Sequence, residues 1–420
     1  MNSIKTNFSL ILFSLIPVSV ILGSSILLVN IVLFGLCFIF FYFTKGYLKI
    51  HDTRSVLLLI ILYLYLIFNS LISNDITEGF YRNFGFIRFI LFFLMTNYLF
   101  FVLEKSSDAF KVWIVIFFVV LVDIYIERFT GSNIFGFGKI EIDGIPQPHG
   151  IRVVSFFRTE PIAGAYICGF TFIIVGHILN FLKSKKIFKF LGFILIILCL
   201  IGVILTGERS NGFKALIGFS IFILIIDYVK LKNKIILFLT IFAIFLISIN
   251  FSDYIKYRYI DALYYKIHSK EDREKFLNNS LYIKLYKSGL NVFKNNPWFG
   301  VGNKNYRIET CGIEKNSTNK DYYCLTHPHQ VYIEMLSEHG IIGTIIIMSI
   351  IFYLAFRLLR KIIESRNYVQ AGCFIYLLIN FIPILPSGSF FNNFNITLFM
   401  INFSLLYAVS KETNIFIKNK

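Results

Sequence analysis

Residues 326–356 read THPHQVYIEMLSEHGIIGTIIIMSIIFYLAF and decide the class of fold. The second half, residues 341–356, is a continuous apolar run, which suits a lipid bilayer rather than a solvated surface. The first half carries three histidines and two glutamates among amphipathic residues. The stretch therefore predicts a membrane-spanning helix whose entrance holds titratable side chains.

The composition extends this pattern to the whole chain of 420 residues. Hydrophobic residues make up 56% and charged residues only 15%, whereas soluble domains carry about 25% charged residues. We expect an all-α polytopic membrane protein with about twelve transmembrane helices. The spans are predicted at 7–23, 25–43, 55–72, 84–103, 112–126, 161–182, 190–206, 213–229, 235–251, 340–356, 370–386 and 393–410.

The distribution of basic residues predicts the orientation. With the N-terminus in the cytoplasm, the inside segments together carry 20 Lys and Arg residues, while the short outer loops 73–83 and 207–212 carry one each. Lys and Arg hold short loops on the cytoplasmic side, so the net charge of +17 is assigned to topology and not to nucleic-acid binding. The first apolar run lacks a small-residue cleavage site, so no cleavable signal peptide is expected.

Two predicted outer segments are long and divide the chain. Residues 1–251 would hold transmembrane helices 1–9 with a shorter periplasmic loop at 127–160, residues 252–330 a large periplasmic loop, and residues 331–420 helices 10–12. The large loop has 13 Lys and Arg against 8 Asp and Glu. It could bind an anionic substrate such as a diphosphate or be an ordinary solvated surface, and charge alone does not separate these.

Six cysteines fall into two groups. Four lie in apolar spans, as small core residues do, whereas Cys311 and Cys324 lie in the polar outer loop. If that side is the oxidising periplasm, the spacing favours a disulfide. A metal site shared with the histidines is the weaker alternative, because the spacing C-x12-C-x2-H-x-H matches no common zinc pattern. We therefore expect no metal.

Several arginines are predicted on the same outer side. Arg209 lies in LTGERSNGF between two spans, and Arg152 and Arg158 lead into another. Arginine captures phosphate oxygens in a bidentate fashion, so these side chains and the histidines could converge on one basic site at the headgroup layer. The alternative for Arg209 is a helix turn with a snorkelling arginine.

Three stretches together resemble the O-antigen ligase and polymerase superfamily. LTGERSNGFKALI resembles its arginine-containing turn, FKNNPWFGVGNKNY is similar to its Pro-x-x-Gly-x-Gly segment, and HPHQVYIEMLSEHGIIG resembles its His-Asn/Gln … Glu-x-Gly-x-x-Gly segment. The resemblance covers roughly residues 150–345. It implies a multi-span fold of the GT-C kind and an inverting, metal-independent glycosyltransferase without a cofactor.

The resemblance also implies a place and substrates. Such enzymes act at the periplasmic face of the bacterial inner membrane on glycans linked to undecaprenyl diphosphate. The superfamily holds polymerases, ligases that transfer the chain to lipid A-core, and protein O-oligosaccharyltransferases. We favour a polymerase, with an acceptor glycan and membrane lipid as further partners. A polysaccharide flippase is disfavoured, because most spans lack charge and one outer loop is large.

The matching positions give the expected catalytic residues, His329 and Arg209. His329 is followed by Gln330, as in the motif, and could act as the base, with His327 as the second candidate. The alternative is that His329 only caps the next helix, with Pro328 in its first turn. Expected substrate-binding residues for the diphosphate or the acceptor are Arg152, Arg158, His327, Lys284 and Glu338. Lys284 is included among them because this sequence has no arginine at the helix start where the superfamily often has one.

Overall fold

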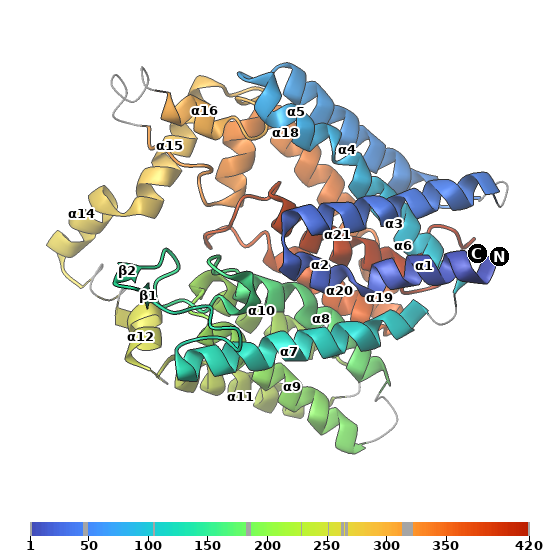
Figure 1. The fold of residues 1–420 in the computed structure, drawn as a ribbon, viewed down its shortest axis with the longest axis horizontal. Coiled ribbons are helices and arrows are strands. Elements are labelled where there is room, and N and C mark those ends of the chain that lie inside the picture. Colours follow the sequence, from blue (N-terminus) through green and yellow to red (C-terminus); the bar gives the residue numbers. More distant parts are fainter. Residues whose placement is uncertain are drawn as a thin grey trace.

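The computed structural model describes residues 2–44, 49–103, 106–181, 186–227, 229–250, 252–261, 264, 268–312 and 322–418. The chain is 73% helical, and the described strands form one antiparallel hairpin, β1 (Glu141–Ile142) with β2 (Ile145–Pro146). The predicted all-α class is therefore confirmed. Long helices run roughly side by side, and both termini lie at one end of the molecule (Figure 1).

Seven helical segments among the described residues are long and apolar enough to cross a membrane. They are Ser24–Thr44, Thr53–Leu71, Ile76–Val102, Ala109–Thr130, Ala163–Phe181, Leu231–Ile249 and Val331–Ser365. Three shorter helical segments are also apolar, namely Gly192–Leu205, Tyr368–Ile379 and Asn393–Ala408. These helices support a multi-pass membrane protein, while the number twelve stays a prediction.

The first predicted span, 7–23, is divided in the structure. Helix α1 (Asn2–Ser14) ends before α2 (Ile16–Leu22) begins. Pro17 lies in the first turn of α2, where its ring would clash with a carbonyl of any continuous helix. Gly23, with φ of 108°, then turns the chain into α3 (Ser24–Thr44). The predicted single span is therefore wrong at this point, and Pro17 and Gly23 account for the division.

The other helices outside the site are α4 (Thr53–Leu71), α5 (Ile76–Phe84), α6 (Ile87–Val102), α7 (Ala109–Thr130), α9 (Lys186–Leu205), α11 (Leu231–Ile249), α19 (Leu359–Ser365) and α21 (Asn393–Ala408).

Glycines bring two central helices into backbone contact. A Cβ atom on Gly176 of α8 (Ala163–Phe181) would lie 2.4 Å from the carbonyl oxygen of Tyr368. One on Gly372 of α20 (Tyr368–Ile379) would lie 2.3 Å from the carbonyl oxygen of Phe172. Small residues allow such close packing in membrane helices. The contact fixes the first turns of α20 beside α8, and α20 also packs against α10 (Arg209–Ile225).

Helix α18 (Val331–Phe356) is kinked at Gly340, whose φ of 63° and ψ of −171° are not helical. The Pro-x-x-Gly-x-Gly segment docks on this kink, because a Cβ on Gly300 would lie 2.4 Å from the backbone carbon of Glu338. Four backbone hydrogen bonds join the two segments: Ile341 N to Pro297 O (2.8 Å), Ile342 N to Trp298 O (3.1 Å), Val301 N to Ser337 O (3.0 Å) and Gly302 N to Glu338 O (2.9 Å). The two superfamily segments thus satisfy each other's backbone groups at the kink.

The predicted outer segment 252–330 lies at the end of the molecule opposite both termini (Figure 1). Its described helices are α12 (Asp253–Lys256), a π-helical turn (Tyr257–Asp261), α14 (Lys270–Asn279), α15 (Leu281–Asn295) and α16 (Tyr306–Cys311). Helix α15 buries Leu285 and Val292, whereas α14 buries no side chain. A disulfide joins Cys311 to Cys324, as the spacing of these two cysteines suggests.

Candidate active site

A cavity of about 720 Å³ lies between α8, α10, the π-helical turn, α14, α15 and the chain after α20. Four cations line it, namely Arg152, Arg209, Lys214 and Arg258. Glu208 is the only carboxylate among its lining residues, and His329 forms part of the wall. Apolar side chains complete the lining, so the cavity combines a basic surface with a surface that suits a lipid chain.

Arg209 and Arg258 are held together at one turn. Arg209 donates from Nη1 to the carbonyl oxygen of Arg258 at 3.2 Å. Arg258 donates from Nε (3.3 Å) and Nη2 (3.1 Å) to the carbonyl oxygen of Gly207. Gly207 has φ of 77°, a conformation that glycine adopts without a steric penalty. The GERSN turn thus places two guanidinium groups in one cavity.

Glu208 ties this turn to the start of α8. Its carboxylate accepts hydrogen bonds from the backbone nitrogen of Gly164 and from Nδ2 of Asn211, both at 2.6 Å. A Cβ at position 164 would lie 2.9 Å from the carboxylate, so glycine allows the approach. Burial raises the pKa of Glu208 to about 7. Glu208 therefore holds the turn that carries Arg209 against the start of α8.

Arg152 comes from the segment 127–160. Nε of Arg152 donates to the carbonyl oxygen of His149 at 3.3 Å. The backbone nitrogen of the next residue, Val153, donates to the carbonyl oxygen of Thr206 at 3.1 Å. Glu127 of α7 accepts from the backbone nitrogen of Val154 at 2.8 Å. These bonds hold the backbone of Arg152 against the turn that carries Arg209.

His329 has a strained backbone with φ of 56°. Its carbonyl oxygen accepts from the backbone nitrogen of Ser387 at 2.9 Å, and its ring faces that of Tyr282 edge-on at 6.0 Å. A non-glycine residue in this conformation often marks a functional site. Burial lowers the pKa of His329, so its imidazole is neutral at neutral pH and can accept a proton.

His329 does not cap α18, which was the alternative for this residue. The N-cap is Gln330, whose side-chain oxygen accepts from the backbone nitrogen of Ile333 at 2.8 Å. Pro328 precedes the cap and lies outside the first turn. The Nε2 atom of Gln330 also donates to the carbonyl oxygen of Pro383 at 2.7 Å. Gln330 therefore caps the helix, while His329 forms part of the cavity wall.

A buried network supports the segment opposite His329. Ser389 donates from Oγ to Glu334 of α18 at 2.5 Å, and the backbone nitrogen of Phe390 donates to the same carboxylate at 3.0 Å. Lys304 approaches Glu334 at 3.7 Å and donates to the hydroxyl of Ser389. This network anchors the chain two residues after Ser387. It therefore fixes the peptide group that holds His329.

The remaining predicted site residues lie outside the cavity lining. The ring of His327 lies 4.0 Å from that of His329, and its pKa falls to about 3 because of burial and of the neighbouring His329. Lys284 is half-buried on α15, and Arg158 is exposed. Glu338 is fully buried, and its carboxylate oxygens have no hydrogen-bond partner among the described residues. Arg152, Arg209 and His329 thus line one cavity, and His327 lies against His329 without lining it, whereas Arg158, Lys284 and Glu338 lie outside the lining.

Sequence reasoning missed Arg258, Lys214 and Asn380, which line the cavity. Arg258 lies in DYIKYRYIDALYY, where tyrosines alternate with basic residues and no single residue stands out. Lys214 follows the GERSN turn inside a predicted span. A lysine within a span usually marks a functional site, so the sequence did contain a signal for this residue. Among the described residues, no group of three or more His, Cys, Asp or Glu side chains could hold a metal ion.

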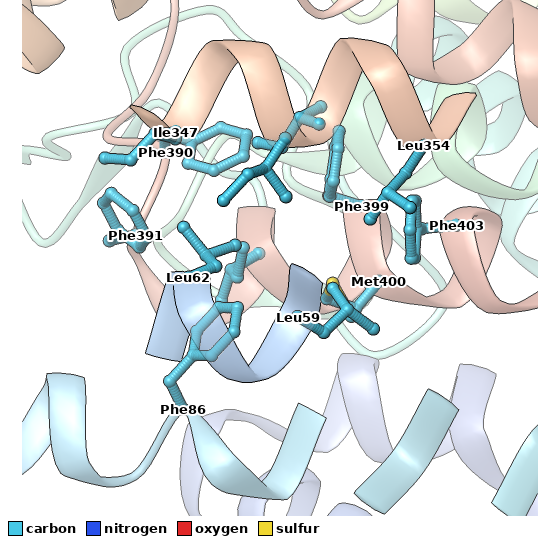
Figure 2. A pocket seen from close by; sticks show the side chains of 13 residues that line it. Leu59, Leu62, Phe86, Ile347, Leu354, Phe390, Phe391, Phe399, Met400 and Phe403 are labelled. Atoms are coloured by element: carbon cyan, nitrogen blue, oxygen red, sulfur yellow. The ribbon is translucent and has the colours of Figure 1, made fainter. Parts of the chain in front are cut away.

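A second pocket is wholly apolar and has a volume of about 20 Å³. Figure 2 shows its walls, which include Leu59, Leu62 and Phe86. Phe390 and Phe399 line both this pocket and the large cavity. The pocket has room for about one water molecule and offers that molecule no polar partner. It is a packing gap behind the apolar wall of the cavity, and not a second site.

The apolar helices indicate a multi-pass membrane protein, and its described residues form a large cavity lined by cations. Residues 194–348 match the model of a family described as O-Antigen ligase. This match confirms the resemblance to the O-antigen ligase and polymerase superfamily, a group of membrane enzymes. The matched range contains Arg209, Lys214, Arg258 and His329. No curated protein matches the chain.

Proposed function

We propose that the protein is an inner-membrane glycosyltransferase that uses an undecaprenyl-diphosphate-linked oligosaccharide as donor and extends a surface polysaccharide. The observation that carries this proposal is the cavity in which four cations face a single carboxylate, with a neutral histidine in the wall. A lipid diphosphate is a suitable leaving group when its charge is held. Stabilising developing charge is usually the largest catalytic contribution.

The proposed orientation puts the cavity at the periplasmic face. Lys and Arg are concentrated in the segments assigned to the cytoplasm, and both termini lie at the end opposite α12 and α14 (Figure 1). In this orientation, residues 252–330 form the periplasmic domain between helices 1–9 and 10–12. A lipid-anchored donor then enters the cavity from the outer leaflet with its diphosphate at headgroup level.

The chemical step assigns one role to each group. The acceptor hydroxyl oxygen attacks the anomeric carbon of the donor, while the bond from that carbon to the diphosphate oxygen breaks. The electron pair leaves with the diphosphate, which Arg152, Arg209 and Arg258 hold through charge-assisted hydrogen bonds. The proton of the acceptor passes to the imidazole of His329. Displacement from the opposite face inverts the anomeric configuration, and no step requires a metal.

The test is a transfer assay with purified full-length protein and lipid-linked oligosaccharide. Three acceptors distinguish the activities: a second lipid-linked repeat for a polymerase, lipid A-core for a ligase, and a Ser/Thr-containing protein for an O-oligosaccharyltransferase. The proposal predicts products of increasing chain length with the first acceptor. Transfer to lipid A-core alone would establish a ligase, as the description of the matched family suggests. Translocation of the lipid without a new glycosidic bond would overturn the enzyme proposal in favour of a flippase.

A further inference from the structure

Lys214 is a buried cation inside the cavity that the chemical step above does not use. It belongs to α10, and only 8% of its surface is exposed. Its Nζ donates to Oδ1 of Asn380 at 3.3 Å. Asn380 follows α20, and its Nδ2 donates to the carbonyl oxygen of Tyr376 at 2.8 Å. The amide is therefore fixed with its oxygen toward the lysine, and further ammonium hydrogens remain for a ligand.

Glu208 attracts this lysine electrostatically, but from beyond ion-pair distance. No described carboxylate lies within ion-pair distance of Lys214. Glu208, the carboxylate in the cavity lining, is already bound by Gly164 and Asn211. A charged side chain among apolar helices is costly and usually marks a ligand or an ion pathway. Because Lys214 lines the cavity and has no ion-pair partner among the described residues, it is placed to bind an anion that enters the cavity.

The position of Lys214 on α10 indicates which anion this is. Lys214 follows Arg209 by five residues, which corresponds to about 7.5 Å along the helix axis. The guanidinium groups of Arg209 and Arg258 thus lie at the start of α10, and the ammonium lies further toward its middle. Apolar side chains of Phe213, Ile379 and Phe399 also line the cavity. The lining around Lys214 therefore suits an anionic group that is attached to a lipid chain.

We infer that Lys214 and Asn380 form a second oxyanion subsite, which binds the lipid-side phosphate of a prenyl diphosphate. Arg209 and Arg258 then bind the sugar-side phosphate. This inference rests on the proposed function, because it divides the donor diphosphate between two levels of one cavity. A carboxylate on a sugar of the glycan is a second source of the same oxyanion chemistry, and lipids without any sugar distinguish the two.

The experiment measures binding of undecaprenyl monophosphate and undecaprenyl diphosphate to the full-length protein in detergent. Lys214→Met should weaken binding of both lipids at least about tenfold, the effect of losing one charge-assisted hydrogen bond. Arg209→Ala should weaken the diphosphate but leave the monophosphate within about twofold. Lys287→Met is the matched control, because Lys287 is exposed on α15 outside the cavity lining, and it should bind both lipids as the unmodified protein does.

The outcomes separate this inference from the proposed function. If the unmodified protein binds neither lipid, the proposed function is overturned. If it binds the diphosphate but Lys214→Met binds both lipids normally, only the lipid-side subsite is overturned. The subsite also fails if Lys214→Met weakens only a donor whose glycan carries a carboxylate. Should Lys214→Met not yield monodisperse protein, Lys214→Gln carries the same expectation.

Discussion

The guanidinium of Arg209 donates to the carbonyl oxygen of Arg258 at 3.2 Å, and the guanidinium of Arg258 donates back to Gly207 of the turn that carries Arg209. Two segments that are 49 residues apart in sequence thus build one cationic wall. The superfamily often has an arginine at the start of the helix that is α15 here. Here Arg258, in the π-helical turn, contributes a guanidinium to the cavity lining.

Arg258→Ala should therefore reduce glycan transfer nearly as strongly as Arg209→Ala, by roughly tenfold or more for one charge-assisted contact. Arg258→Lys should not restore it, because an ammonium lacks the planar fork that holds both a phosphate and the Gly207 carbonyl. The measurement is the initial rate with lipid-linked donor. Lys256→Ala is the control, since Lys256 is exposed two residues away. Equal rates for Arg258→Ala and Lys256→Ala would remove Arg258 from the site.

The kink at Gly340 gives a prediction about stability. Gly300→Ala should lower the free energy of unfolding by about 2 kcal/mol or more, because it adds backbone strain and places a Cβ 2.4 Å from the backbone of Glu338. Gly144→Ala in the β-hairpin is the control. Gly144 also has positive φ, 76°, but nothing lies within 4 Å of its added Cβ, so about 1 kcal/mol is expected. Thermal unfolding in detergent measures both, and equal shifts would contradict the docking of the two segments.

The disulfide predicts a dependence on redox state. Removal of the Cys311–Cys324 bond with Cys324→Ser should destabilise the outer segment by about 2–4 kcal/mol, as for other short loops. Alkylation and mass spectrometry of protein purified without reductant should find both cysteines blocked, while Cys37 is partly exposed and free. Free alkylation of both Cys311 and Cys324 under those conditions would contradict the pairing.

The pH profile of transfer should reflect His329. Burial lowers its pKa, and a base acts in its neutral form, so activity should stay constant from neutral pH down to below about 6.5. At lower pH the imidazole becomes protonated and activity should fall. This fall should be absent from the residual activity of His329→Ala. A limb centred near pH 7 that disappears in Glu208→Gln would instead assign the titration to Glu208, whose pKa is about 7.

Much of the fold could be predicted because lipid imposes long apolar helices, as residues 341–356 illustrate. Arg152, Arg209 and His329 could be brought together from their common predicted side of the membrane. Arg158 illustrates the limit. Val154 and Phe157 are buried, and the chain turns at Arg158 with φ of 61°, so its side chain is exposed. No sequence pattern predicts that turn.

The lining that was missed depends on contacts distant in sequence. Asn380 meets Lys214, 166 residues away, where α20 packs against α10. Single-sequence patterns show that such helices exist, but they do not show which faces meet. The docking of residues 297–302 on the kink at Gly340 is likewise a contact between segments that are distant in sequence. Both segments could be recognised separately, and their contact could not.

The most direct test of the account separates donor binding from transfer in His329→Ala. The variant should bind undecaprenyl diphosphate within about twofold of the unmodified protein, because the cations hold the diphosphate. Its transfer rate should fall about 10²–10⁴-fold, the usual contribution of a general base. His327→Ala is the matched control and should keep a substantial part of the rate, since His327 does not line the cavity. A normal transfer rate in His329→Ala would contradict the central claim. Loss of all transfer activity in the control His327→Ala would contradict it as well.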